Sequence, residues 1–223
     1  RELFDEYTFD RRIAAIPTGV QFQVYPQLTD DRFLLPLPIG KRWLGAVGGI
    51  DYGTVHPSAL VVVTVDENRV AWVREVAFRE KNSGDTAWIH GMKGALSARY
   101  NCYRWNTDPN ERYLAKSYEA QAVSYSESSR GFRIGLVRTR LDYNGLFYDR
   151  DGRGVPELYE EQKRVHYRKQ RDGQLVLVRF GEDRTAGLED AIEALDGKKT
   201  LEIPPPAKIQ YRRQTKKREF TKV

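Results

Sequence analysis

Two aspartates that end predicted strands are the residues of this sequence best suited to chemistry. Asp51 closes the stretch AVGGID before a glycine turn, and Asp108 closes CYRWNTD directly before Pro109. An isolated Asp-x-Gly is typical of a surface turn, where water and backbone N–H groups satisfy the carboxylate. Two carboxylates held close together instead repel each other, and a divalent cation removes that repulsion. Mg²⁺ prefers oxygen ligands, and pairs of such ions promote phosphodiester hydrolysis.

A third acid that could complete such a site lies in DRTAGLEDAIEALD, residues 183–196, which has the spacing of an amphipathic helix. We favour Asp190, because on a helix it shares a stripe with small residues that let another backbone approach closely. Those small residues are Ala186, Gly187 and Ala194. The competing acids are Glu189, Asp183 and Glu193. Taken alone, these acids also fit ordinary solvated helix charges, some of them near a helix N-terminus.

The elements that must position these acids follow from apolar periodicity and turn residues. The predicted strands are residues 46–51, 58–65, 69–78, 102–108 and 132–139. The predicted helices are residues 83–100, 112–126 and 183–196. Residues 141–185 form an irregular insertion, with a helical stretch in 155–169, a strand in 174–180 and a hairpin turn at 171–173. The order is therefore three strands, then alternating helices and strands, an insertion and a last helix.

This order is that of the ribonuclease H fold. The predicted fold class is α/β, with a ribonuclease H-like mixed β-sheet flanked by helices and a hairpin-containing insertion before the last helix. In that fold the first and fourth strands lie side by side and run parallel. Asp51 and Asp108 stand at the carboxyl ends of those two strands, so we expect them to be neighbours.

Composition excludes several other kinds of site. The single cysteine, Cys102, rules out an internal disulfide and a multi-cysteine metal site, and the three histidines show no metal-ligand spacing. No apolar run is long enough to cross a membrane. Residues 207–223 hold seven Lys and Arg against Glu219 alone, which accounts for the whole net charge of +6. This basic tail is either a candidate arm for DNA or an acidic partner, or a solvated chain end.

Three short motifs resemble a known family. They are GGIDYGTVHPSALVVV around Asp51, WNTDPNE around Asp108, and ELYEEQKRVHYRK followed by a hairpin and LEDAIEAL. Their order and their settings on strands and a helix are similar to those in the nuclease domain of the large terminase subunit, the DNA-packaging motor of tailed bacteriophages. The resemblance extends from about residue 46 to residue 196.

The resemblance implies a metal-dependent endonuclease that cleaves double-stranded DNA during viral genome packaging. Asp51, Asp108 and Asp190 would be the catalytic residues and would bind two Mg²⁺ or Mn²⁺ ions for in-line hydrolysis. The family often has Asp or His where Glu189 stands, so Glu189 remains an alternative third ligand, as does Asp183.

DNA is expected to be held through its phosphates, because a packaging nuclease need not read bases. The candidate contacts are Lys163, Arg164, Arg168, Lys169 and Arg171. Ion pairing with Glu157, Glu160 and Glu161 on a surface helix explains these basic residues equally well.

The resemblance also sets the expected organisation. The chain contains no phosphate-binding Gly-x-x-x-x-Gly-Lys-Ser/Thr loop. Residues 1–45 would be a linker from a missing N-terminal ATPase domain, residues 46–197 the nuclease domain, and residues 198–223 a proline-rich spacer and basic tail. Through the parent protein, the expected partners besides DNA are the viral portal or procapsid and the small terminase subunit, in the host cytoplasm. The alternatives are a junction resolvase or transposase-like nuclease, and a non-catalytic module that binds DNA or the portal.

Overall fold

The computed structural model describes residues 23–53, 56–80, 86–108, 112–122, 130–169, 175–177 and 183–196. Its strands are β1 (Leu34–Leu35), β2 (Trp43–Asp51), β3 (Ser58–Asp66), β4 (Ala71–Arg79), β5 (Cys102–Thr107), β6 (Gln121–Ala122), β7 (Leu146–Asp149), β8 (Tyr167–Lys169) and β9 (Leu175–Leu177). Its helices are the short 3₁₀ turn η1 (Asp31–Phe33), α3 (Thr86–Tyr100), α4 (Arg112–Ser117), α5 (Arg130–Asp142), α6 (Val155–Arg164) and α7 (Asp183–Asp196).

The main sheet has the strand order β1-β7-β4-β3-β2-β5-β6. The strands β2, β3 and β4 form an antiparallel meander, whereas β5 lies parallel to β2, and β7 lies parallel to β4. The register pairs Ile50 with Thr107, so the two predicted site aspartates each follow a paired residue at adjacent strand ends. The predicted mixed α/β fold with β2 and β5 as parallel neighbours is confirmed.

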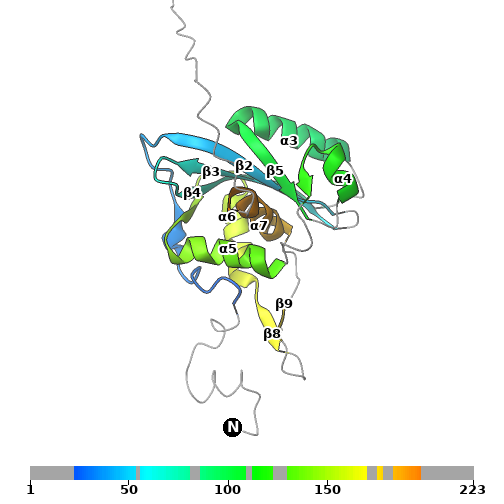
Figure 1. Ribbon diagram of the computed structural model, residues 1–223. Coiled ribbons are helices and arrows are strands. Elements are labelled where there is room, and N and C mark those ends of the chain that lie inside the picture. The colour runs from blue at the N-terminus through cyan, green and yellow to red at the C-terminus, as the bar shows by residue number, and fades with distance from the viewer. Residues whose placement is uncertain are drawn as a thin grey trace, which may run out of the picture.

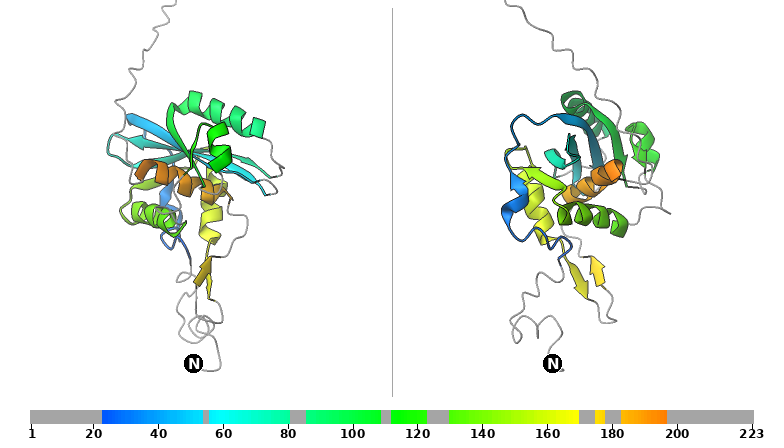
Figure 2. Two further views of the ribbon diagram at one scale, coloured as in Figure 1. Left: turned by 45° about the vertical axis from the view of Figure 1, so that its right-hand side comes forward. Right: turned by 60° about the vertical axis from the view of Figure 1, so that its left-hand side comes forward.

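Helices cover both faces of this sheet (Figures 1 and 2). Because side chains alternate along a strand, β2 contributes to both layers. Its Ala46 and Ile50 pack in a cluster with Ile89 of α3 on one face. Its Val47 packs in the larger cluster on the other face, which also contains residues of α5, α6 and α7. The central strand β3 is buried along its whole length, as its continuous apolar sequence predicts.

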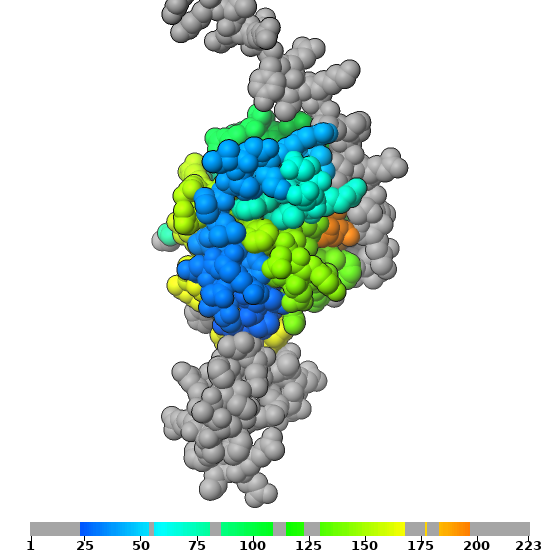
Figure 3. Space-filling view, turned by 90° about the vertical axis from the view of Figure 1, so that its left-hand side faces the viewer, coloured from blue at the N-terminus to red at the C-terminus, as the bar shows by residue number. Residues whose placement is uncertain are grey.

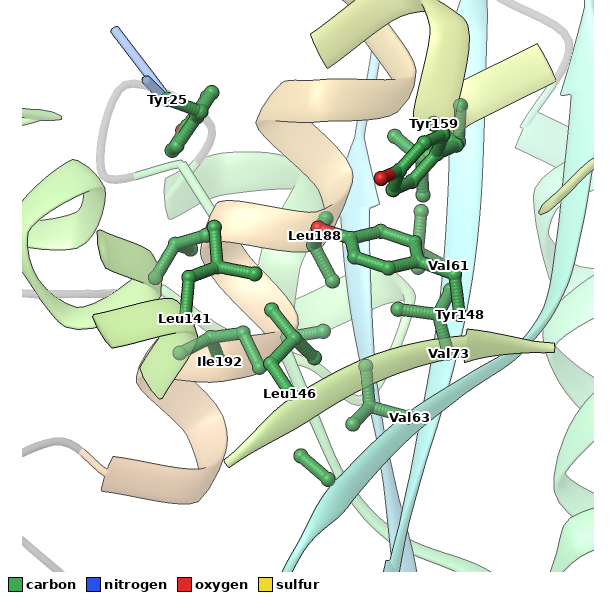
Figure 4. Close-up of a cluster of buried hydrophobic side chains, with 14 of the residues drawn as sticks. Tyr25, Val61, Val63, Val73, Leu141, Leu146, Tyr148, Tyr159, Leu188 and Ile192 are labelled. Atoms are coloured by element: carbon green, nitrogen blue, oxygen red, sulfur yellow. The ribbon is translucent and has the colours of Figure 1, made fainter. Parts of the chain in front are cut away.

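The larger core cluster fixes the last helix against the sheet. Figure 4 shows Leu188 and Ile192 of α7 among side chains from β3, α5 and β7. The side chains of Leu188 and Ile192 are both fully buried. Burial of side chains of this size contributes about 1.5–3 kcal/mol each, so this apolar face sets the rotation of α7 about its axis.

Residues 23–42 are part of the same core. Val24 and Phe33 are completely buried, and β1 adds to the edge of the sheet beside β7. Figure 3 shows this N-terminal segment, in blue, lying along one side of the molecule beside α5. Its position there agrees with the 2.6 Å hydrogen bond that the Gln27 amide donates to Asp142 at the end of α5.

One predicted element is wrong and two helices end earlier than predicted. Residues 132–139 were predicted as a strand, but they lie inside helix α5. Its buried residues are Arg133, Ile134, Val137 and Leu141, which is a helical spacing. Of the helix predicted over 112–126, residues 112–117 form α4, the two-residue strand β6 follows, and residues 123–126 lie outside the described residues. The helical stretch predicted in 155–169 ends at Arg164 as α6, and residues 167–169 form β8. The strand that pairs beside β4 is β7.

The predicted insertion before the last helix contains a hairpin. Strands β8 and β9 pair antiparallel, and they extend away from the sheet and its helices (Figure 1). The predicted turn at 171–173 lies outside the described residues. No helix within the described ranges is long and apolar enough to cross a membrane.

Candidate active site

Asp51 lies at the carboxyl end of β2 on the face of the sheet that α7 covers. Along β2, Val47 belongs to the core cluster on that face, and a Cβ atom on Gly49 would meet the backbone of α7. Residues two apart on a strand point to the same side. Asp51 therefore continues the row of Val47 and Gly49 and is directed toward the helical layer.

Asp108 follows β5 and lies on the same face. Gly49 pairs with Asn106 across the parallel ladder, so the positions two residues further on are also neighbours. The carboxylate of Asp108 accepts a hydrogen bond from Arg133 of α5, which packs in the α7 layer. The aspartate side chain is 27% exposed. This end of the candidate site is therefore open to solvent.

Asp190 reaches the site because α7 approaches β2 without an intervening side chain. A Cβ atom on Gly49 would lie 1.9 Å from the carbonyl oxygen of Gly187, 2.5 Å from the Ala191 nitrogen and 3.0 Å from Cβ of Asp190. Glycine at 49 is what permits this contact, and a Cβ atom on Gly187 would instead lie 3.1 Å from the Val61 side chain of β3. Asp190 is only 2% exposed, so it forms the buried end of the site.

Arg133 joins two of the three aspartates. Its Nη2 donates a 3.0 Å hydrogen bond to Oδ2 of Asp108, and its Nη1 lies 2.9 Å from Oδ1 of Asp190 as an ion pair. The Asp190 contact lacks hydrogen-bond geometry, because neither Nη1 nor this Oδ1 has a hydrogen-bond partner among the described residues. The sequence interpretation missed Arg133. A buried arginine on the apolar helical spacing of α5 was the signal that could have identified it.

The electrostatics of the site reflect three acids and one arginine. Burial raises the pKa of Asp190 well above its ordinary value; Arg133 opposes this shift, and the charges of Asp51, Asp108 and Glu189 add to it. Burial lowers the pKa of Arg133, but the carboxylates of Asp190 and Asp108 outweigh that effect and the pKa is raised. The negative charges of Asp51 and Asp108 thus both act on the buried carboxyl of Asp190.

Both carboxylate oxygens of Glu189 are bound by residues outside this cluster, although its charge also acts on Asp190. It is fully buried, its Oε1 accepts a 2.7 Å hydrogen bond from the Tyr25 hydroxyl, and its Oε2 pairs with Arg130 at 2.9 Å. Burial and the Glu189 carboxylate raise the pKa of Tyr25 well above its ordinary value, so the phenol remains a donor. Glu189 therefore ties α7 to the N-terminal segment and to α5.

This arrangement predicts a structural role for Glu189. Glu189→Gln is expected to cost about 1–3 kcal/mol of unfolding free energy, because the amide cannot satisfy both Tyr25 and Arg130. We expect it to retain metal-dependent cleavage of DNA within about tenfold of the unchanged protein. Thermal unfolding and plasmid cleavage at a temperature where both proteins are folded would measure this. A loss of cleavage as complete as that of an Asp190 variant would instead make Glu189 the third ligand.

The other two candidate acids of α7 lie elsewhere. Asp183 is the first residue of the helix, about two turns before Asp190. Glu193 is 5% exposed, and its charge acts on Arg104 of β5. Neither is among the groups that shift the pKa of Asp190.

The residue types of the cluster fit a divalent metal ion. Oδ1 of Asp190 is buried without a hydrogen bond to any described residue, and the adjoining acids offer only oxygen donors. Such donors suit Mg²⁺ or Mn²⁺. Within the described ranges, however, no group of three or more His, Cys, Asp or Glu side chains is arranged so that it could hold an ion. The guanidinium of Arg133 lies where Asp108 and Asp190 would otherwise face a common cation.

The predicted DNA-contacting residues are only partly described. Lys163 pairs with Glu160 at 2.9 Å and with Asp31 at 3.4 Å, in agreement with the alternative of a surface ion-pair network. Arg164 is exposed at the end of α6. The side chains of Arg168 and Lys169, and the whole of Arg171, lie outside the described residues.

Comparison of the sequence with protein-family models and with curated proteins gives no match. The fold, in contrast, matches solved structures. The large terminase of the thermophilic bacteriophage D6E in complex with ATP-γ-S aligns with 78% of this chain at 13% identity and a TM-score of 0.63, and the chain covers 45% of that protein.

Two separate nuclease domains match over nearly their whole length. The large terminase nuclease domain of Thermus phage P74-26 aligns at 17% identity and a TM-score of 0.56, covering 78% of this chain and 97% of that one. The large terminase nuclease from thermophilic phage G20c with bound magnesium aligns at 18% identity and a TM-score of 0.53, covering 77% and 97%. These likenesses show that the chain has the ribonuclease H-like fold of the large terminase nuclease domains of thermophilic phages.

Proposed function

We propose that the chain is a metal-dependent endonuclease that cleaves double-stranded DNA during viral genome packaging. The observation that carries this proposal is that the charges of Asp51 and Asp108, at two adjacent strand ends, both act on the buried carboxyl of Asp190. Support also comes from the similar G20c nuclease, which has been solved with bound magnesium and with bound cobalt.

In this proposal the three aspartates divide between the open and the buried end of the site. Asp51 and Asp108, at the strand ends, would bind the ions at the open end of the site, where DNA can enter. Asp190 of α7 would bind them at the buried end. When bound, two Mg²⁺ or Mn²⁺ ions supply the positive charge that activates water and stabilises the leaving oxygen of an in-line hydrolysis. The sheet and α7 bring the three positions to one face of the sheet, and their side chains would have to rearrange to share an ion.

The setting we propose is a packaging motor. The chain spans about half the length of the D6E large terminase, a protein solved in complex with ATP-γ-S. We propose that an ATPase domain precedes residues 1–45 in the parent protein and that residues 198–223 form a spacer and basic tail. Through that parent protein, the partners would be the portal or procapsid and the small terminase subunit, in the host cytoplasm.

Removal and return of the metal ion test the proposal directly. Supercoiled plasmid incubated with the protein and Mn²⁺ is expected to be nicked and linearised, EDTA is expected to stop the reaction, and excess Mn²⁺ is expected to restore it. Asp51→Asn serves as the negative control prepared in the same way. Cleavage that persists in this variant, or no cleavage under any of these conditions, would contradict the proposal. The second result would favour a non-catalytic module that binds DNA or the portal.

A further inference from the structure

Arg133 contacts two of the three acids of the cluster, and it comes from a different layer than the strands that carry Asp51 and Asp108. Its side chain is 5% exposed on α5. It lies within 3.0 Å of Asp108 and 2.9 Å of Asp190. A divalent ion shared by these two carboxylates would be strongly repelled by a guanidinium held there.

The formal charges of the site change with the position of this arginine. Glu189 is compensated separately by Arg130. Counted by themselves and with every group ionised, the three aspartates and the guanidinium carry a formal charge of −2, which one divalent ion balances. Two divalent ions carry a charge of +4. Three carboxylates and one DNA phosphodiester together carry −4, so two ions are neutralised only when the DNA phosphate is present and the guanidinium has left the site.

The guanidinium is also poorly satisfied where it lies. Its Nε and Nη1 atoms are buried and have no hydrogen-bond partner among the described residues, and only Nη2 is bonded to Asp108. Buried donors without acceptors cost free energy. The planar guanidinium fork matches the oxygens of a phosphate group, which present acceptors to two nitrogen atoms at once.

We propose that Arg133 is the internal counter-ion of the acid cluster, that divalent cations must displace it from Asp108 and Asp190, and that its freed guanidinium then binds a DNA phosphate. This inference rests on the proposed function, because it assumes that the three aspartates hold the metal ions. It assigns to Arg133 the control of metal affinity: the site binds ions weakly while DNA is absent and more tightly once a phosphate draws the arginine away.

Calorimetric titration with Mn²⁺ in the absence of DNA tests this inference. Arg133→Gln is expected to bind Mn²⁺ about tenfold or more tightly than the unchanged protein, because a positive charge has been removed from the site. The matched control is Arg138→Gln, an exposed arginine on the same helix, for which the affinity is expected not to change. Equal or weaker Mn²⁺ binding by Arg133→Gln would overturn the inference.

The two proposals can fail separately in this experiment. If Mn²⁺ binds both proteins alike and plasmid is cut, only the role of Arg133 fails. If Arg133→Gln binds Mn²⁺ more tightly but neither protein cuts DNA, the role of Arg133 stands and the nuclease proposal fails. If Mn²⁺ binds neither protein and plasmid is cut, only the role of Arg133 fails; if Mn²⁺ binds neither protein and plasmid is not cut, both proposals are overturned.

A second measurement covers the case in which Arg133→Gln does not fold. Crystals of the unchanged protein soaked in Mn²⁺ are expected to show the ion beside Asp108 and Asp190 and the guanidinium moved from both. An ion bound there with Arg133 still contacting both carboxylates would overturn the inference.

Discussion

Asp190→Asn is expected to reduce metal-dependent cleavage of DNA by about a thousandfold or more. Loss of a carboxylate ligand removes several kcal/mol of stabilisation that the metal ions supply to the transition state, and each 1.36 kcal/mol corresponds to a factor of ten in rate. Asp190 should be the most sensitive of the three positions. It is 2% exposed, so water cannot readily replace the missing ligand, whereas Asp108 is 27% exposed.

The same substitution is expected to make the metal-free protein more stable. Burial among like charges raises the pKa of Asp190, so the folded state binds this proton more tightly than the unfolded chain does. The free energy of unfolding contributed by Asp190 is therefore largest at low pH. It falls as the pH rises from about 3.9, the ordinary value in an unfolded chain, through the raised pKa. An asparagine does not ionise, so Asp190→Asn avoids this loss of stability. We expect its free energy of unfolding at neutral pH to be higher by about 1 kcal/mol, which corresponds to 2–4 °C in Tm.

Plasmid cleavage and thermal unfolding in EDTA, both measured across a range of pH, would test this pair of effects. The matched control is Asp151→Asn, an exposed aspartate in the turn before α6, which should change neither cleavage nor the pH profile of stability. Near-normal cleavage by Asp190→Asn would falsify the assignment of Asp190 as a ligand. A Tm in EDTA that falls by several degrees would contradict the electrostatic explanation.

Gly49→Ala is expected to cost about 3–5 kcal/mol of unfolding free energy, the largest effect on stability that we predict for a single methyl group. The added Cβ would lie 1.9 Å from the Gly187 carbonyl oxygen and 2.5 Å from the Ala191 nitrogen. Both atoms belong to the backbone of α7, so no flexible side chain can move aside and the helix itself must shift. Overpacking of this kind usually costs 1–3 kcal/mol and more where the structure cannot relax.

Denaturant unfolding of Gly49→Ala beside Gly91→Ala would test this prediction. Gly91 lies on the exposed side of α3, and a Cβ atom added there would have no other atom within 4 Å. Gly91→Ala is therefore expected to stabilise the protein by about 0.5–1 kcal/mol. Because α7 carries Asp190, folded Gly49→Ala protein is also expected to lose cleavage. A cost below 1 kcal/mol would show that α7 and β2 are not packed through these glycines.

Much of the sheet and two of the three acids follow from local sequence patterns. The meander of β2, β3 and β4 and the last helix were predicted close to their bounds, because apolar runs and turn residues mark them within the chain. Asp51 and Asp108 were predicted as neighbouring site residues because each ends a predicted strand. Their adjacency required only the chain order of the elements and the preference for parallel neighbouring strands.

Helix α5 was predicted wrongly because its sequence supports two periods. FRIGLVRT contains isoleucine, valine and threonine and nearly alternates apolar with polar residues, as a strand does. Its true spacing places Arg133 on the buried face. An arginine is rarely buried without a partner, and the partners here are Asp108 and Asp190, which lie 25 and 57 positions away.

The sequence by itself determined the meander of β2, β3 and β4, the strand β5, the last helix and the two aspartates at strand ends, since each depends on residues close together in the chain. It did not predict β1, β6 or β7, which complete the sheet. Only the tertiary structure decided which neighbours the acids of α7 contact. Glu189 and Asp190 are consecutive, and a helix turns about 100° between them, so each faces a different neighbour. Glu189 faces Tyr25, 164 positions away, and Asp190 faces the strand ends and Arg133. No local pattern records such contacts, because a buried charge is compensated by whichever element the fold brings against it.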